Sequence, residues 1–144
     1  MIALGCDHGG YTLMREIKTL LDEKGLSYRD FGTDSETSVD YPDFAKPVAQ
    51  AVADGQCERG ILVCGTGIGM SMAANKVSGI RAALCGDCFS AEMTRCHNDA
   101  NILCLGARTT GAGLALKIAE IFLETPFEGG RHALRVEKIM EMER

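Results

Sequence analysis

Short hydrophobic runs alternate along this chain with longer segments in which hydrophobic residues recur every three or four positions. The runs at 2–6, 61–64, 81–85 and 102–105 are almost entirely apolar, which is typical of parallel strands covered on both faces. A fifth strand is predicted at 27–31. The strands are therefore expected to lie inside the molecule, between layers of helices.

The segments with helical spacing predict six helices. In the first, at 11–24, one stripe of hydrophobic residues ends at Gly25, a residue that often terminates helices. Asp40 is predicted to cap the second helix and Ser90 the fourth. The expected ranges are about 40–54 for the second helix, the residues after the loop 65–69 up to 76 for the third, a short segment from 90 for the fourth, 110–124 for the fifth and 131–143 for the last.

Alternating strands and helices predict a three-layer α/β/α sandwich with a five-stranded parallel sheet, Rossmann-like, plus a C-terminal helix. The crossovers should be right-handed, and residues 1–144 should form one domain. Ligands of such folds bind beyond the carboxyl ends of the strands. The loops that should carry the chemistry are 7–10, 32–39, 65–69, 86–89 and 106–109.

Composition and charge exclude several classes of protein. The 144 residues carry a net charge of −5, which argues against general binding to nucleic acid or to an anionic membrane surface. No apolar run approaches the roughly 20 residues that a membrane span needs. The residues after Met1 predict a first strand and not a signal peptide, so we expect a cytoplasmic protein.

Seven cysteines with irregular spacing predict buried, reduced thiols and no disulfide framework. Cys85 and Cys88 form a lone C-x-x-C, which leaves a metal or redox role open. A zinc site would need a second pair of ligands, and the sequence has none at a suitable spacing, so no metal ligands are assigned.

Cys64 stands at the head of the loop Gly65-Thr66-Gly67-Ile68-Gly69, between a strand and a helix. Backbone N–H groups at a helix start attract anions, and the same field favours a thiolate. A thiolate beside such donors suits proton removal next to a carbonyl. Two alternatives remain. The first is a tight turn after a buried cysteine. The second is a dinucleotide-binding loop with Asp87 as its acidic residue, although Met70 stands where such a loop needs a small residue.

Other loops offer acids, bases and cations. Asp7 and His8 follow the first strand and could form either a ligand site or a capped turn. His97 and Asn98 precede the last strand, where they could bind a sugar or simply end a helix.

A possible phosphate site lies near the C-terminus. Arg131 and Arg135 are four residues apart, so they share a face of the last helix and could clamp a phosphate, with Arg108 as a third cation. The alternative is a basic helix start that pairs with Glu128 or Glu137.

Taken together, these residues resemble the type B ribose-5-phosphate isomerases, whose superfamily includes allose-6-phosphate isomerase and the galactose-6-phosphate isomerase subunits. The resemblance extends almost from end to end of the chain. The matching motifs are Gly5-Cys6-Asp7-His8-Gly9-Gly10, Asp40-Tyr41-Pro42-Asp43, Cys64-Gly65-Thr66-Gly67-Ile68-Gly69, Ala73-Ala74-Asn75-Lys76, Gly79-Ile80-Arg81-Ala82, His97-Asn98-Asp99 and Gly129-Gly130-Arg131-His132-x-x-Arg135.

The resemblance implies a role for each matching residue. Cys64 matches the catalytic base, and His97 matches the residue thought to help open the sugar ring. Asp7 matches a substrate-contacting position, and we take it as the candidate acid–base partner of His97. Met70 cannot take a proton, which places the chain outside the branch that uses a glutamate there. The implied substrate contacts are Asp7, His8, Tyr41, Gly65, Thr66, Gly67, Ile68, Gly69 and Asn98; Thr66 also belongs to the catalytic set, and the implied phosphate ligands are His8, Arg108, Arg131 and Arg135.

The expected reaction is aldose–ketose isomerisation of a sugar phosphate, most simply ribose 5-phosphate to ribulose 5-phosphate, through a cis-enediolate. No cofactor is expected. Because His97 precedes the fifth strand, it should lie toward the amino end of the sheet, and we predict that it reaches the active site of a second copy in a homodimer, with a dimer of dimers as a further option. The rival hypotheses are a six-carbon sugar phosphate as substrate, a nucleotide-binding protein and a non-catalytic sugar-phosphate sensor.

Overall fold

The computed structural model describes residues 1–143 and contains a sheet of five parallel strands in the order β2-β1-β3-β5-β4. This confirms the predicted α/β class, and the strands lie within two residues of their predicted ends. Their bounds are β1 Ile2–Cys6, β2 Tyr28–Asp30, β3 Arg59–Cys64, β4 Ala82–Leu84 and β5 Ile102–Gly106.

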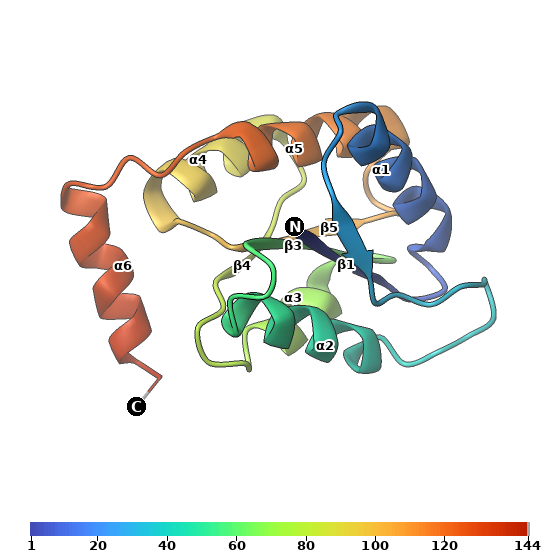
Figure 1. The fold of residues 1–144 in the computed structure, drawn as a ribbon, viewed down its shortest axis with the longest axis horizontal. Helices are drawn as coiled ribbons and strands as arrows, with labels where there is room; N and C mark the ends of the chain where they lie inside the picture. The colour runs from blue at the N-terminus through green and yellow to red at the C-terminus, as the bar shows by residue number, and fades with distance from the viewer. Residues whose placement is uncertain (144) are drawn as a thin grey trace.

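Helices cover both faces of the sheet (Figure 1). One layer contains α1, α4 and α5, and the other contains α2 and α3, while α6 stands at one end of the molecule against α4. The helix bounds are α1 Tyr11–Glu23, α2 Pro42–Ala53, α3 Ile68–Ala74, α4 Cys88–Asn98, α5 Ala112–Glu124 and α6 Arg131–Glu141.

The hydrophobic core lies on both sides of the three central strands. Every residue of β1 and β5 is buried, and β3 is buried from its second residue onward. The expectation that 81–85 is equally covered was wrong, because β4 is an edge strand and the side chain of Leu84 is 42% exposed. The apolar sequence of that strand did not reveal its position at the edge of the sheet.

Two helix caps differ from their predictions. The fourth helix is capped by Asp87, whose side chain accepts the backbone N–H of Ser90 at 2.7 Å, and it is longer than predicted. The second helix is preceded by Tyr41 without a side-chain cap, although Asp40 was predicted for that role. Asp, Ser and Thr are interchangeable as sequence signals for a cap, so only the backbone conformation identifies which one caps.

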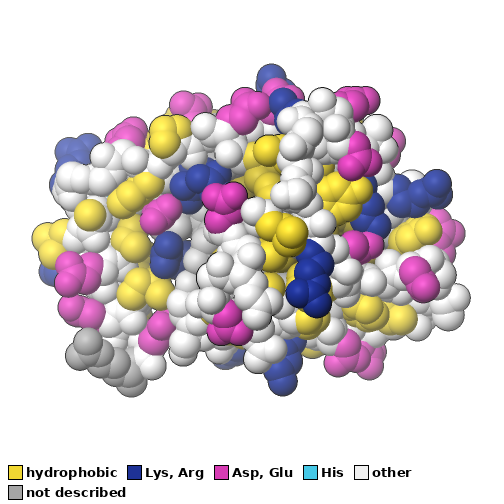
Figure 2. Space-filling model, in the orientation of Figure 1, with side chains coloured by type: hydrophobic (Ala, Val, Ile, Leu, Met, Phe, Trp, Pro, Cys, Tyr) yellow, Lys and Arg dark blue, Asp and Glu magenta, His cyan; other side chains and the backbone are white. Residues whose placement is uncertain are grey.

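Two surface features bear on function. Figure 2 shows basic and acidic side chains interspersed on one face, without a continuous basic stripe on that face. Within residues 1–143, no helix combines the length and apolar character that a bilayer crossing requires.

Candidate active site

Three loops meet at the carboxyl ends of β1, β3 and β5. The backbone N–H of Asp7 donates to the carbonyl of Val63. The N–H of Ala107 donates to the carbonyl of Cys64, and that of Arg108 donates to the carbonyl of Gly65, both at 2.9 Å. These bonds exist because parallel strands in register end at the same edge of the sheet. The loops after the strands are thereby held against one another.

Cys64 ends β3, and its side chain is only 5% exposed. Its sulfur accepts the backbone N–H of Gly67 at 3.1 Å. A donor aimed at the sulfur stabilises negative charge on it, which a proton-abstracting thiolate requires. The loop after β3 thus presents one backbone N–H to this sulfur.

Glycine is required in the glycine loop (residues 65–69) because other parts of the chain approach it closely. Gly67 has φ +78°, and a Cβ there would lie 2.9 Å from the backbone of Leu105. A Cβ at Gly69 would lie 2.5 Å from the ring of Tyr41. Tyr41, a predicted substrate contact, therefore lies directly against the loop, while Thr66 and Ile68 are exposed.

Asp7 and His8 lie at the neighbouring loop. Asp7 is 7% exposed, and one carboxylate oxygen accepts the backbone N–H of Gly10 at 3.1 Å. Nδ1 of His8 accepts the N–H of Val39 at 3.1 Å, so the neutral ring carries its proton on Nε2. A Cβ at Gly9 would be 3.3 Å from both Asp7 and the backbone nitrogen of Gly65, which places this loop beside the glycine loop.

Arg108 supplies a cation at the same place. Its guanidinium lies against Gly65, where an added Cβ would be 3.4 Å from Nη1. The structure thus brings Asp7, His8, Tyr41 and Arg108 together around Cys64 and the glycine loop. An acid, an imidazole, a thiol and a guanidinium at one edge of the sheet can transfer protons and hold an anion.

The other predicted residues lie elsewhere in the chain. His97 and Asn98 form the end of α4, while Arg131 and Arg135 lie on α6. In Figure 1, α6 and the end of α4 stand at one end of the molecule, and the segment between β2 and α2, which contains Val39, extends from the other. The predicted site is therefore divided into two groups of residues within one chain.

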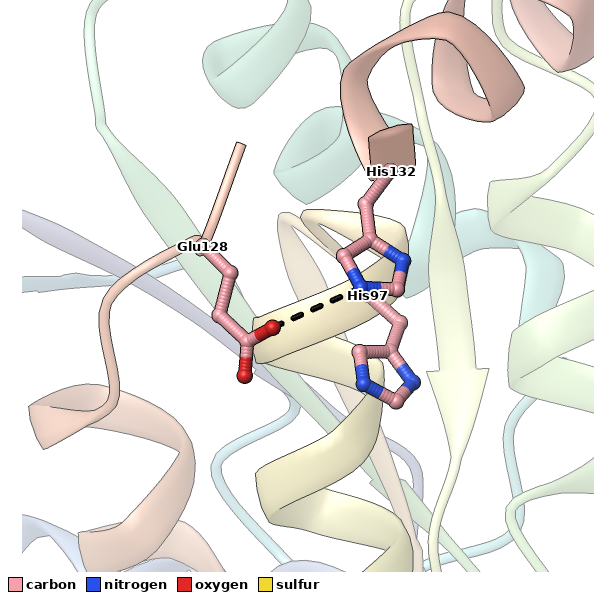
Figure 3. A group of neighbouring side chains, drawn as sticks. All are labelled: His97, Glu128 and His132. Carbon is pink, nitrogen blue, oxygen red and sulfur yellow. Dashed lines mark ion pairs between the residues drawn. The ribbon is translucent and has the colours of Figure 1, made fainter. Parts of the chain in front are cut away.

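The second group contains residues that the sequence analysis did not assign. The ring of His97 stacks on that of His132, with centroids 4.2 Å apart and planes inclined by 13°. Nε2 of His132 lies 3.4 Å from Oε2 of Glu128 (Figure 3). These three side chains, here called the histidine cluster, come from α4, the segment after α5 and the start of α6.

The electrostatics of the histidine cluster favour a neutral His132. Burial is the main cause that lowers the pKa of this imidazole, and the positive charges of His97, Arg131 and Arg135 act in the same direction, while Glu128 opposes them. Glu128 was considered in the sequence as a partner for Arg131, but it pairs with His132. A spacing of four residues between Glu128 and His132 was the available sequence signal, and the intervening Gly129-Gly130 obscured it.

Most of the remaining thiols are structural. Burial raises the pKa of Cys6 to about 12 and that of Cys85 to about 11, so both stay protonated near neutral pH. All seven cysteines are free, and six of them are buried as predicted, whereas Cys88 is only partly buried. Within the described residues, the metal-type grouping of side chains is the histidine cluster, and the Cys85–Cys88 pair is not part of it.

Comparison with known proteins gives a consistent result. The profile of the ribose/galactose isomerase family matches residues 2–139. A ribose-5-phosphate isomerase B from Clostridium thermocellum superposes with a TM-score of 0.97 at 57% identity, covering 99% of this chain and 96% of the other. Ribose-5-phosphate isomerase B of Escherichia coli is 49% identical, over 99% of this chain and 95% of the relative. A D-erythrulose-4-phosphate isomerase from Pectobacterium atrosepticum is 47% identical, over 96% and 91%.

Proposed function

Because the chain belongs to the ribose/galactose isomerase family and is a sugar phosphate isomerase of the aldose–ketose class, we propose that it interconverts ribose 5-phosphate and ribulose 5-phosphate through a cis-enediolate. The observation that carries the mechanism is Cys64, which is buried at the head of the glycine loop with the N–H of Gly67 on its sulfur. Residues 1–144 would act as one isomerase domain in the cytoplasm, where seven free thiols persist in reduced form.

The proposed chemistry begins with opening of the sugar ring, for which His97 and Asp7 are the acid–base candidates. The thiolate of Cys64 then takes the proton from C2, and the carbonyl oxygen at C1 becomes the enediolate oxyanion. N–H groups of the glycine loop would hold that charge, and one such donor contributes about 3 kcal/mol in other enzymes. Cys64 returns the proton to C1 while the hydroxyl proton on O2 passes to the oxygen on C1, which leaves a ketone at C2 and balances the steps without a cofactor.

Recognition of the phosphate is assigned to side chains in both groups of residues. Arg108 lies against Gly65, and His8 is held by Val39. Arg131 and Arg135 are exposed on α6, and within residues 1–143 neither makes an ion pair. Two guanidiniums without a partner at a helix start are consistent with a phosphate clamp.

A second copy of the chain would complete the site. His97, Asn98 and the two arginines of α6 stand apart from their own glycine loop, so we propose that they reach the glycine loop of the partner in a two-fold dimer. Leu134 and Ile139 on α6 are 56% and 46% exposed. Partner contacts would cover this apolar face.

The mechanism is tested by replacing Cys64. Turnover of Cys64→Ser should fall by a factor of about 10²–10⁴, as expected when a general base is lost, while circular dichroism and Tm stay close to the parent values. Cys88→Ser removes a partly exposed thiol outside the loop and is the matched control. Full activity in Cys64→Ser would remove Cys64 from the mechanism.

The substrate is tested by a side-by-side assay. Ribose 5-phosphate, allose 6-phosphate and galactose 6-phosphate should be compared with erythrulose 4-phosphate, because one relative is named for that four-carbon substrate. We expect the highest kcat/KM with ribose 5-phosphate. Binding of ribose 5-phosphate without turnover would instead support a non-catalytic sensor, and fluorescence titration with NADH should detect no binding.

A further inference from the structure

We propose that His97, His132 and Glu128 form a binding site for Zn²⁺, and that the bound ion inhibits the isomerase because it coordinates His97. The inhibitory part rests on the proposed role of His97 in ring opening, whereas the metal site itself does not. No metal ligand was assigned in the sequence: Glu128 was considered only as a partner for the basic start of the last helix, and His132 was given no role. The three side chains come together only through the packing of α6 against α4.

The distances suit a tetrahedral ion. One potential ligand atom from each of the three residues lies within 4.8 Å of the other two. Bonds of about 2.0–2.1 Å to Zn²⁺ place neighbouring ligands about 3.3 Å apart in a tetrahedron. Nε2 of His132 and Oε2 of Glu128 are already 3.4 Å apart.

His97 requires only a small adjustment. Its ring is nearly parallel to that of His132, and Figure 3 shows each ring with one nitrogen on the side where Glu128 lies. These two nitrogens therefore point in similar directions, and a tilt about χ2 of His97 would direct both toward one ion. Rotation about this bond is soft in histidine because its rotamer wells are broad.

The type of ligand determines the type of ion. Two imidazole nitrogens and one carboxylate suit Zn²⁺, and the same set with one water is common in zinc enzymes. Mg²⁺ and Ca²⁺ prefer sites made mostly of oxygen ligands, so they should bind weakly here. The side chain of Glu128 is 54% exposed and that of His132 is 10% exposed, which leaves an entry path on the carboxylate side.

Nearby charges set limits on the affinity. Arg131 and Arg135 act on His132 from α6 and repel a cation, whereas Glu128 attracts one. The Cys96 thiol lies beside Glu128; burial and the carboxylate charge raise the pKa of this thiol. Cys96 is therefore a possible competing ligand, and it must be controlled in any test.

Direct binding tests the metal site without reference to catalysis. Calorimetric titration of the full chain with Zn²⁺ should show one site per chain that weakens at least tenfold in His132→Asn and in Glu128→Gln. His8→Asn removes the third histidine of the sequence and should leave the affinity unchanged, as should Cys96→Ser. Unchanged binding in His132→Asn and Glu128→Gln, or loss in Cys96→Ser alone, would overturn the site.

Inhibition tests the functional consequence. Zn²⁺ should reduce turnover, EDTA should restore it and Mg²⁺ should have no effect. Glu128→Gln should retain turnover without metal and should need at least tenfold more Zn²⁺ for the same inhibition. If Zn²⁺ binds at the histidine cluster but turnover is unaffected, the inhibitory claim fails. The two claims can fail separately. If the parent protein does not bind Zn²⁺, the metal site is refuted. If His97→Asn nevertheless loses turnover, the proposed function still stands.

Discussion

At the scale of single residues, the surroundings of each thiol decide what it can do. Cys6, Cys64 and Cys104 all end or lie within central strands and are almost fully buried. Burial strongly raises the pKa of Cys104, as it does for Cys6. Cys64 differs because the chain turns back immediately after it and presents the N–H of Gly67 to its sulfur. The same residue type thus packs in the core in two places and meets a backbone donor of the glycine loop in one.

Thiol reactivity should follow these surroundings. In the native protein at pH 8, iodoacetamide should modify the partly exposed Cys88 and leave Cys6, Cys85 and Cys104 intact. With a pKa of about 11, only about one Cys85 in a thousand is a thiolate at that pH, and the fraction rises tenfold for each pH unit above it. Peptide mass spectrometry at successive times measures the labelled fraction of each cysteine. Equal labelling of Cys85 and Cys88 would contradict the expectation.

Gly67 should not tolerate a side chain. Gly67→Ala would force alanine into φ +78° and place its Cβ 2.5 Å from Leu84 and 2.9 Å from the Leu105 backbone. Strain of this kind costs about 1–3 kcal/mol, so Tm should fall and turnover should fall with it. Gly86→Ala is the matched control for stability, because a Cβ there meets no atom within 4 Å. Equal Tm values for the two variants would refute the argument.

At the scale of elements, the helix ends are where the structure departs from the expected pattern. The start of α4 is fixed by Asp87, which accepts both the N–H and the hydroxyl of Ser90. The interior of each helix is specified by its repeating hydrophobic face, but an end depends on one side chain and its local backbone. That is why element types were predicted correctly while several ends and caps were not.

The Asp87 cap should make stability depend on pH. The hydrogen bonds from the N–H and the hydroxyl of Ser90 lower the pKa of Asp87, so the charged carboxylate stabilises the folded state above the unfolded pKa of about 4. This contribution is lost as the pH falls through the lowered pKa. Asp87→Ala should therefore lower Tm by a few degrees at pH 7, and the difference from the parent should shrink in acid.

Asp87→Asn is the control for that measurement. It retains an acceptor for the cap but has no titrating group, so its Tm deficit should be smaller than that of the alanine variant. Thermal unfolding followed by circular dichroism between pH 3 and pH 7 measures all three proteins. A deficit of Asp87→Ala that stays constant over this range would show that the charge of Asp87 does not contribute.

At the scale of the whole molecule, one chain carries the predicted site residues in two separate groups. The glycine loop lies at the carboxyl ends of the strands, and the histidine cluster lies near the amino ends, beside α6. A compact chain of this topology cannot bring the two together, because strand length separates them. Association of two copies would resolve the separation, since each copy then supplies what the other lacks.

Mixing two inactive variants tests this arrangement. Cys64→Ser and His97→Asn should each have little turnover alone. After subunit exchange, half of the dimers would be mixed and one of their two sites would be intact, so about a quarter of the parent activity should return. A mixture that gains no activity, although mass spectrometry of labelled chains confirms exchange, would show that His97 does not act across the dimer.

The sequence by itself determined the α/β class, the strands and helices, and the residues around Cys64. Hydrophobic periodicity and glycine spacing are local properties, and parallel strands bring their following loops to one edge, so Asp7 and Arg108 could be expected beside the glycine loop. Only the tertiary structure decided that β4 is an edge strand and that Glu128 and His132 join His97. These outcomes depend on strand order and on how α6 packs against α4, which are contacts between distant segments that no local pattern encodes.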